Sequence, residues 1–500
     1  MRKSVCIKQL SLALLPMLLC TIFSSTRTEA ADAPSKSLLP VRIEEHGTTE
    51  ARSVIQSRGK LTLDIYLRAV DTNFPGLAGA EDQRRIANSS VLEKKGIFDP
   101  LFSTENGYTR MQNTSRIGAD KFVLFNYPKF ELPFQSGVRA FAQYRYNPNS
   151  AQSPYIETGE GGEYSAGILV PLLRGLFVNE QSVALKEAKL GTELATQTYF
   201  LTRLDTLVRA GVSYWSWVGS KQKSDVSAQI LRLSNTIAGI ARQQEQNGDL
   251  ARIYVTEAEE DIARRDADMS QARRDFQRNS FKLSTLLFDI GGIPLPIPSE
   301  ENVPEEIPLP AEISTTQTEH HIMLALRGRP ELKAIDVQKD IAKVELKLAQ
   351  NQLLPVANAV YTEGYDTGKN GIGNVYRGQI TISEPLLLRT ARGKVAGAKL
   401  RLDKLAKERQ AEEQRIRNEV LDAISAINLA FQKSQALEQQ VAKADQVYQG
   451  ERERFQIGDS TVFLVAERER QLNEAKIRLI DAEVEYHLGV LALRAITVQL

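Results

Sequence analysis

The sequence VSAQILRLSNTIAGIARQQEQNGD at residues 226–249 combines two features that predict a long helix and the point where it turns back. Its apolar residues recur at alternating steps of four and three, the spacing of a coiled-coil seam: Val226, Ile230, Leu233, Ile237 and Ile240. The closing pair, Gly248-Asp249, is typical of a tight turn. We therefore expect a helix that packs along one face and reverses direction at this pair.

The helical pattern extends far beyond this sequence and occurs a second time. No proline interrupts the chain between Pro171 and Pro294, or after Pro385. The second run has its own turn pair, Gly458-Asp459, and its own seam at Val420, Ile424, Ile427 and Phe431. Each run is expected to fold into an antiparallel helical hairpin. An arm of about 70 residues, rising about 1.5 Å per residue, would be on the order of 100 Å long and would cross a compartment.

Other short sequences recur in the same order in the two halves. Pro171-Leu172-Leu173-Arg174 returns as Pro385-Leu386-Leu387-Leu388-Arg389, and Ala188-Lys189-Leu190 returns as Ala398-Lys399-Leu400. Such self-similarity indicates an internal repeat. We interpret the chain as a tandem duplication, with repeats at 61–290 and 317–500 joined by a proline-rich linker at 291–316. Each repeat should begin with a moderate helix, at 62–95 and at 316–353.

Short segments of alternating character precede each hairpin. In residues 376–383, Tyr, Gly, Ile and Ile share one face of an expected strand, while Arg, Gln, Thr and Ser share the other; residues 138–146 repeat this pattern. Such a strand suits a wall between lipid and water, or one side of an ordinary soluble sheet. In the first repeat we expect strands at 136–146 and 162–170, a third candidate at 101–111, and loops at 113–134 and 147–160.

The number of these strands bears on how they are used. Each repeat supplies two or three of them, and a closed barrel needs roughly eight. An open sheet edge cannot face lipid, because its unpaired backbone groups would have no hydrogen-bond partner there. If the strands face lipid, several chains must contribute to one barrel.

The N-terminal residues 1–30 have the features of a secretory signal. Arg2, Lys3 and Lys8 precede an apolar run that extends from residue 10 to residue 23, and Thr28-Glu29-Ala30 follows it. Its removal takes away Cys6 and Cys20, the only two cysteines, and so excludes disulfides and cysteine metal sites. It also removes four basic residues and one acidic residue, which changes the net charge from +1 to about −2 and disfavours nucleic acid as a partner. Residues 31–60 are expected to be a mobile N-terminal extension.

The duplicated order of these pieces resembles the outer-membrane efflux protein family, which is TolC-like, over nearly the whole mature chain. The matching pieces are the proline-punctuated first helices, the Pro-Leu-Leu strand exits and the Gly-Asp turns followed by acidic helices. The resemblance implies a mainly α fold with β: long coiled-coil hairpins form a periplasmic tunnel, and about four strands per chain enter a shared, twelve-stranded trimeric barrel in outer-membrane lipid. It also implies a passive export duct that docks onto a periplasmic adaptor (membrane-fusion) protein and an inner-membrane pump.

The resemblance further implies where the periplasmic entrance lies. The turn pairs Gly248-Asp249 and Gly458-Asp459 would form the periplasmic tips. Family members often carry acidic residues about six and nine positions after the second tip glycine, where they ring the constriction. In this sequence those positions are Leu464 and Glu467, and Glu257 holds the corresponding place in the first repeat. Symmetry-related carboxylates around a narrow axis would attract cations, whereas the alternative interpretation makes Glu257 and Glu467 ordinary exposed helix residues.

Nothing in the sequence predicts an enzyme or a cofactor. The phosphate-binding loop, the Gly-x-Ser-x-Gly elbow and the His-Glu-x-x-His zinc motif are all missing. The four histidines, His46, His320, His321 and His487, are expected to be simple surface residues rather than metal ligands. The rival interpretation is a periplasmic coiled-coil adaptor or scaffold without a pore, although adaptors usually carry one hairpin rather than two.

Overall fold

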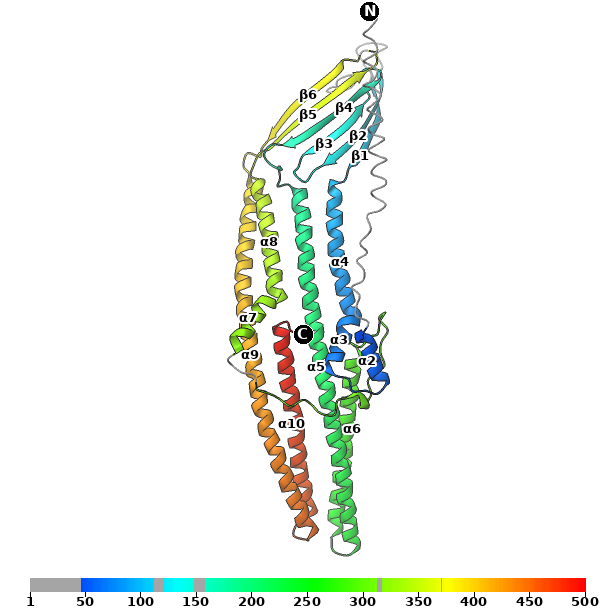
Figure 1. Cartoon of the computed structure of the whole chain (residues 1–500), viewed down its shortest axis with the longest axis vertical. Coiled ribbons are helices and arrows are strands. Elements are labelled where there is room, and N and C mark those ends of the chain that lie inside the picture. The colour runs from blue at the N-terminus through cyan, green and yellow to red at the C-terminus, as the bar shows by residue number, and fades with distance from the viewer. Residues whose placement is uncertain (1–45, 112–120, 148–157, 313–316, 370) are drawn as a thin grey trace, which may run out of the picture.

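A computed structural model describes residues 46–111, 121–147, 158–312, 317–369 and 371–500. The molecule is elongated, with a sheet at one end and helical hairpins that extend away from it to the other end (Figure 1). The expected signal segment 1–30, and residues 31–45 of the expected extension, lie outside the described residues. Within the described part of the chain, no helix is both long enough and apolar enough to cross a membrane.

Two long helical hairpins form the body of the molecule. The first joins α5 (Glu180–Gln246) to α6 (Arg252–Ser284), and the second joins α9 (Arg389–Gln456) to α10 (Val462–Ile496). The ascending helices have 67 and 68 residues, as the proline-free runs predicted. Helix α5 begins with a capping box, in which the Asn179 side chain accepts a hydrogen bond from the Ser182 N–H and the Ser182 side chain accepts one from the Asn179 N–H.

Shorter helices lie beside the long helices below the sheet (Figure 1). Helices α3 (Leu63–Asn73) and α4 (Pro75–Lys95) precede the first strands, and α7 (Thr318–Gly328) and α8 (Pro330–Asn351) precede the later ones. Pro75 and Pro330 each occupy a first helical turn, where a missing N–H costs no hydrogen bond. Helix α4 packs on α5, α5 on α8, and α8 on α9, so these four helices form one row beneath the sheet (Figure 1).

Within the described residues, the sheet has six antiparallel strands whose spatial order follows the sequence. They are β1 (Leu101–Met111), β2 (Lys121–Pro133), β3 (Arg139–Arg145), β4 (Gly162–Pro171), β5 (Val356–Thr367) and β6 (Gly373–Ser383). The strands expected at 136–146 and 162–170 are β3 and β4, and the third candidate at 101–111 is β1. The mixed helical and strand fold class is confirmed.

The expected number of strands was too low, because the segment that forms β2 contains prolines and was interpreted as a loop. We expected about four strands and a loop at 113–134, but residues 121–133 form a strand. Proline is tolerated in a strand only where its missing N–H is not needed. Strand β2 pairs continuously with β3 only over residues 129–133, so Pro128 lies just beyond that ladder.

A second correction concerns the N-terminal extension. Residues 46–56 form helix α2 (His46–Gln56), and Ala51 and Ile55 are buried with Leu61 in a core around Trp217. The linker contributes Leu295, Val303 and Ile307 to the same core. The amide of Asn302, which is 1% exposed, donates a hydrogen bond of 2.9 Å to the Gly59 carbonyl. The segment that carries Ala51, Ile55 and Leu61 is therefore packed rather than a mobile extension, because apolar side chains distant in sequence cover these residues.

Candidate functional site

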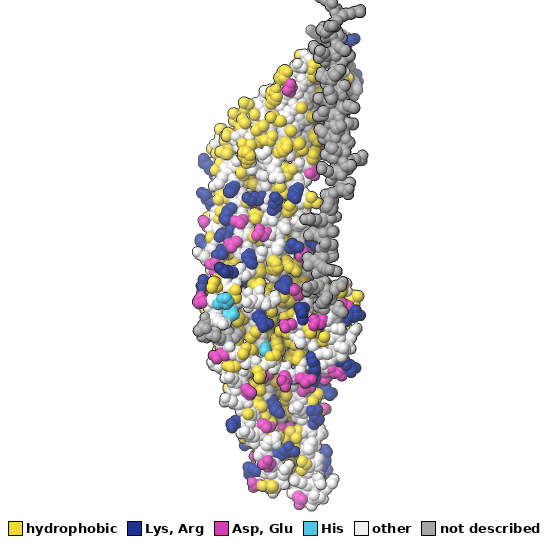
Figure 2. Space-filling view, in the orientation of Figure 1, with side chains coloured by type: hydrophobic (Ala, Val, Ile, Leu, Met, Phe, Trp, Pro, Cys, Tyr) yellow, Lys and Arg dark blue, Asp and Glu magenta, His cyan; other side chains and the backbone are white. Residues whose placement is uncertain are grey.

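The two faces of the sheet differ sharply in character. Tyr144, Tyr164 and Tyr365 are paired in register on neighbouring strands and point to one face, with the rings of Tyr144 and Tyr164 4.7 Å apart. This outward face runs across all six strands and carries large exposed side chains, seen as the apolar surface near one end in Figure 2. Its exposed members include Phe102, Tyr108, Tyr164, Tyr361, Tyr376, Ile380 and Ile382.

The opposite face is lined by polar and charged side chains. Glu163 of β4 is 1% exposed and lies between two arginines, with Arg145 of β3 at 2.6 Å and Arg377 of β6 at 2.7 Å. Lys129 and Arg139 both contact Glu131 in a second cluster, at 2.6 and 3.1 Å. Buried carboxylates paired with guanidinium groups satisfy their hydrogen bonds without water. The alternation expected at 138–146 and 376–383 is thus present in the register of the sheet.

The expected tip residues lie at the turns between the paired long helices, at the end of the molecule farthest from the sheet (Figure 1). Gly248 has φ +85° and Gly458 has φ +80°, the left-handed conformation that closes a helix at low cost only for glycine. The N–H groups of Asp249 and Asp459 donate to carbonyls of the last helical turn, Gln244 and Arg454, both at 2.9 Å. Local chemistry therefore explains both turns.

Two of the three expected entrance residues come together. Glu257 of α6 and Glu467 of α10 line the same cavity between the two hairpins, near the tips. Glu467 accepts hydrogen bonds from Arg470 at 2.6 and 2.9 Å and from Gln471 at 2.9 Å. The Arg470 guanidinium holds the pKa of the Glu467 carboxyl below its usual range. Leu464 is 39% exposed and does not line this cavity.

A further acidic residue near the tips was missed by the sequence analysis. Glu469 of α10 is 2% exposed, and its Oε1 atom has no hydrogen-bond partner. Burial raises the pKa of Glu469 to about 7, the Asp261 carboxylate adds to the rise, and the Arg265 guanidinium opposes it. A signal was available: in the steps Val462, Val465, Glu469 and Leu472, a carboxyl group occupies a place in the apolar seam.

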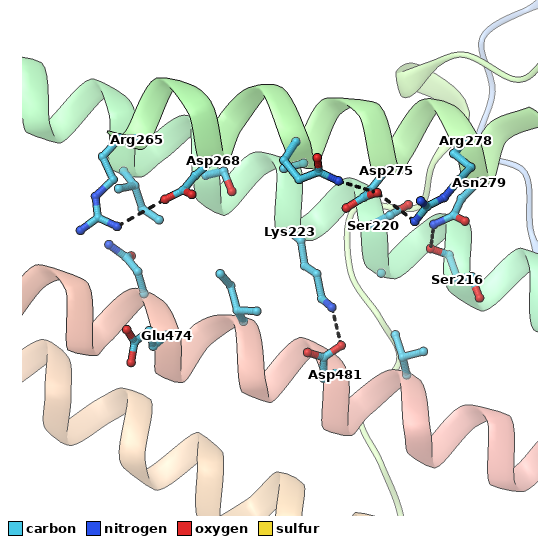
Figure 3. Close-up of a pocket in the computed structure, with 18 of the residues that line it drawn as sticks. Ser216, Ser220, Lys223, Arg265, Asp268, Asp275, Arg278, Asn279, Glu474 and Asp481 are labelled. Atoms are coloured by element: carbon cyan, nitrogen blue, oxygen red, sulfur yellow. Dashed lines mark hydrogen bonds and ion pairs between the residues drawn. The ribbon is translucent and has the colours of Figure 1, made fainter. Parts of the chain in front are cut away.

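A groove of about 620 Å³ lies between the hairpins, above the tip cavity. Figure 3 shows its arrangement: α5 forms the floor with Ser216, Ser220 and Lys223, while α6 and α10 form the walls. Charged residues line the walls, and Lys223 crosses to pair with Asp481. Gly219 allows α5 and α10 to approach each other closely here, because a Cβ at this position would come within 2.7 Å of a Val484 methyl group on α10.

The described residues hold no group of three or more His, Cys, Asp or Glu side chains that could bind a metal ion. His487 is not the simple surface residue that we expected. Its ring stacks on Trp215, with centroids 4.2 Å apart, and one ring nitrogen lies 2.8 Å from the Pro308 carbonyl of the linker. The linker and α5 both reach it from distant parts of the sequence, which explains why sequence reasoning missed the contact.

Comparisons with known proteins agree with this architecture. Residues 322–498 match the model of the family described as outer membrane efflux protein. No curated protein sequence matches the chain. The family match supports an outer-membrane channel for efflux, and it confirms over these residues the resemblance that the repeated motifs indicated.

Solved structures extend the similarity in fold to most of the chain. The outer membrane protein VceC from Vibrio cholerae has a TM-score of 0.64 at 15% identity, covering 87% of this chain and 95% of its own. CusC has a TM-score of 0.64 at 13% identity, covering 87% and 91%. The MtrE channel of Neisseria gonorrhoeae has a TM-score of 0.60 at 14% identity, covering 87% and 88%. At these identities the solved structures show that the chain shares their fold.

Proposed function

We propose that this protein is the outer-membrane component of a tripartite efflux or secretion system, a passive export duct across the periplasm and the outer membrane. The observation that carries the proposal is the union, in one chain, of a sheet with one apolar and one charged face and of helical hairpins that extend away from it (Figures 1 and 2). The apolar face suits outer-membrane lipid, and the charged face suits a water-filled passage.

The length of the hairpins supports a role in the periplasm. Helix α5 has 67 residues, which corresponds to roughly 100 Å at about 1.5 Å per residue. A helix of this length, with an acidic and basic surface, reaches across an aqueous compartment. We propose that Gly248, Asp249, Gly458 and Asp459 are the periplasmic tips, and that Glu257, Leu464 and Glu467 surround the entrance.

The sheet supports assembly from several copies. Six strands are fewer than the roughly eight that close a barrel, so one chain cannot form the wall alone. The proposed assembly is a homotrimer, which docks onto a periplasmic adaptor and an inner-membrane pump. The charged groove between α6 and α10 is the surface that we propose for an adaptor helix, because its walls carry both signs of charge.

The proposed history of the chain follows from the same elements. The signal at 1–30 directs export and is removed, and the repeats at 61–290 and 317–500 arose by duplication around the linker 291–316. Each repeat contains a helix, strands and a long hairpin, with glycine turns at corresponding places. Export to the outer membrane is required for the function proposed here.

Mass and conductance of the native protein test the proposal together. The full chain is expressed with its N-terminal segment, extracted from the outer membrane in detergent, sized, and inserted into a planar bilayer. We expect a trimer that stays with the outer membrane after a salt wash and conducts ions. A monomer that is recovered from the periplasm and does not conduct would contradict the proposal and favour the adaptor or scaffold.

A further inference from the structure

We propose that all six strands enter the barrel wall and that β6 of one copy pairs with β1 of the next, so that three copies close eighteen strands, three times six. This inference rests on the proposed trimeric duct. It departs from the twelve-stranded barrel that the family resemblance implied, because the first half of this chain contributes four strands rather than two.

The first step is that β1 and β2 have the same two faces as the other strands. Phe102 of β1 is paired with Phe130 of β2, which is paired with Ala142 of β3, so all three point outward. Phe102 is 66% exposed and Phe130 is 40% exposed. Leaving these rings in water would be unfavourable, whereas lipid would cover them. The hairpin of β1 and β2 therefore suits the wall rather than an aqueous loop.

The inner face continues across β2 in the same way. Lys129 and Glu131 of β2 face inward with Gln143 and Phe141 of β3, their register partners. The ion pair between Glu131 and Arg139 joins the two strands at 3.1 Å on that side. A charged inner surface and an apolar outer surface extend from β2 to β6 without a change of sides. Side chains along these strands therefore alternate between an inner and an outer face, as they do in the wall of a single barrel.

The second step compares the widths of the strand row and the helix row. Six strands about 4.8 Å apart, tilted by about 40°, span an arc of roughly 38 Å, whereas four strands would span roughly 25 Å. The row of α4, α5, α8 and α9 beneath them, at about 8–10 Å per helix, spans roughly 32–40 Å. At this spacing and tilt, six strands fit the width of the helix row. This comparison holds for any number of copies in the ring.

The third step is that the ends of both rows coincide. Helix α4 leads into β1, and β6 leads into α9, and these two helices are the ends of the helix row. When copies stand side by side, α9 of one copy meets α4 of the next, and β6 then meets β1. The two edge strands have 11 residues each and run in opposite directions, which suits an antiparallel pair.

Pairing of the two edge strands would also supply hydrogen-bond partners for the backbone groups at the edges of the sheet. Among the described strands, β1 and β6 each have one neighbouring strand. A sheet edge in lipid leaves N–H and C=O groups without partners, at a cost of several kcal/mol for each group. A second copy of this chain supplies a strand of matching length, direction and sidedness. At the same tilt, the circumference of this barrel would be about one and a half times that of a barrel with four strands per chain.

Cysteine cross-linking tests the pairing. Thr104→Cys on the outward face of β1 is combined in turn with Gly378→Cys, Ile380→Cys or Ile382→Cys on the outward face of β6. Steps of two residues keep every cysteine on the same face, and the three positions sample three successive registers of the pair. We expect at least one pair to give covalent dimers and trimers after oxidation of the outer-membrane protein, and the single-cysteine variants to give no trimer.

The matched control replaces the β1 position by one on β3. Ala142→Cys is also outward, but β2 separates it from the edge, so with the same β6 cysteines we expect no covalent trimer. Trimers from the β3 and β6 pairs, with none from β1 and β6, would overturn the inference while leaving the duct intact. A monomeric, non-conducting native protein would instead remove the proposed function itself.

A count of strands in the native protein decides the matter if the cysteine variants fail to reach the outer membrane. Electron microscopy of the detergent-extracted trimer should show eighteen strands in cross-section through the barrel. Twelve strands, with the hairpin of β1 and β2 outside the wall, would overturn the inference.

Discussion

Glu469 is the residue whose environment departs most from its position in the sequence. It occupies a seam position of α10, is 2% exposed, and faces Asp261 and Arg265 of α6. A carboxyl group in such a place is more stable when protonated, since burial penalises the charged form. By contrast Glu467, two residues earlier, is held ionised by Arg470. The two carboxyl groups thus have opposite electrostatic roles on one helical turn.

The pKa of Glu469 has a consequence for stability. Its pKa rises from 4.5 to about 7 on folding, so the folded chain binds this proton more tightly than the unfolded chain does. The resulting stability is fully present below about pH 4.5 and is lost as the pH rises through about 7, a total of about 3 kcal/mol.

Glu469→Gln should remove that loss. We expect the variant to be more stable than the native protein at pH 8 and nearly equal to it at pH 4, measured by thermal unfolding with circular dichroism. Glu257→Gln, at an exposed position on α6, is the matched control and should leave the pH dependence unchanged. Identical pH profiles for Glu469→Gln and the native protein would contradict the assignment.

At the scale of elements, the hairpins depend on their turns and on the absence of proline. Each long helix reverses at a glycine with positive φ, and the following N–H groups bond to carbonyls of the last helical turn. The arms pack through cores of small and branched residues, such as the one that joins Ala238, Ala258 and Val465 near the tips. A change in a turn should therefore weaken a whole hairpin.

Gly458→Ala should destabilise the second hairpin. An alanine at φ +80° costs about 1 kcal/mol or more, although a Cβ there would meet no other atom within 4 Å. We expect a lower midpoint of thermal unfolding. Gly450→Ala is the control, since Gly450 lies inside α9, also with open space around a Cβ, and alanine there should stabilise by about 1 kcal/mol. Equal effects of the two changes would show that the turn conformation is not the cause.

At the scale of the whole molecule, the proposed trimer would have properties that a single chain does not have. One Glu467 is an ordinary ion-paired residue at 2.6 Å from Arg470, whereas three copies around an axis would place three carboxylates at one level. A narrow passage with such a ring would concentrate cations. The proposed barrel closure likewise depends on edges that belong to different copies.

Glu467→Ala should weaken cation blockade of the conducting trimer several-fold, because each substitution removes one carboxylate from the proposed ring. The measurement is single-channel conductance with increasing divalent cation. Since the pKa of Glu467 is lowered, blockade of the native channel should persist somewhat below pH 4.5. Glu474→Ala, farther from the tip on the same helix, is the control. Unchanged blockade in Glu467→Ala would exclude Glu467 from the entrance.

The sequence by itself determined the features that depend on local interactions. Apolar spacing and missing prolines predicted the long helices, Gly-Asp pairs marked the turns, and alternation identified β3 and β6, because each follows from the geometry of a few neighbouring residues. Tertiary structure decided the rest. Strand β2 forms despite Pro128 because β1 pairs with residues 121–131, and α2 packs because Trp217 and the linker share its core. The seam position of Glu469 is visible in the sequence, but the groups that surround Glu469 and His487 come from helices and a linker far away in the sequence, so no local pattern could reveal those contacts.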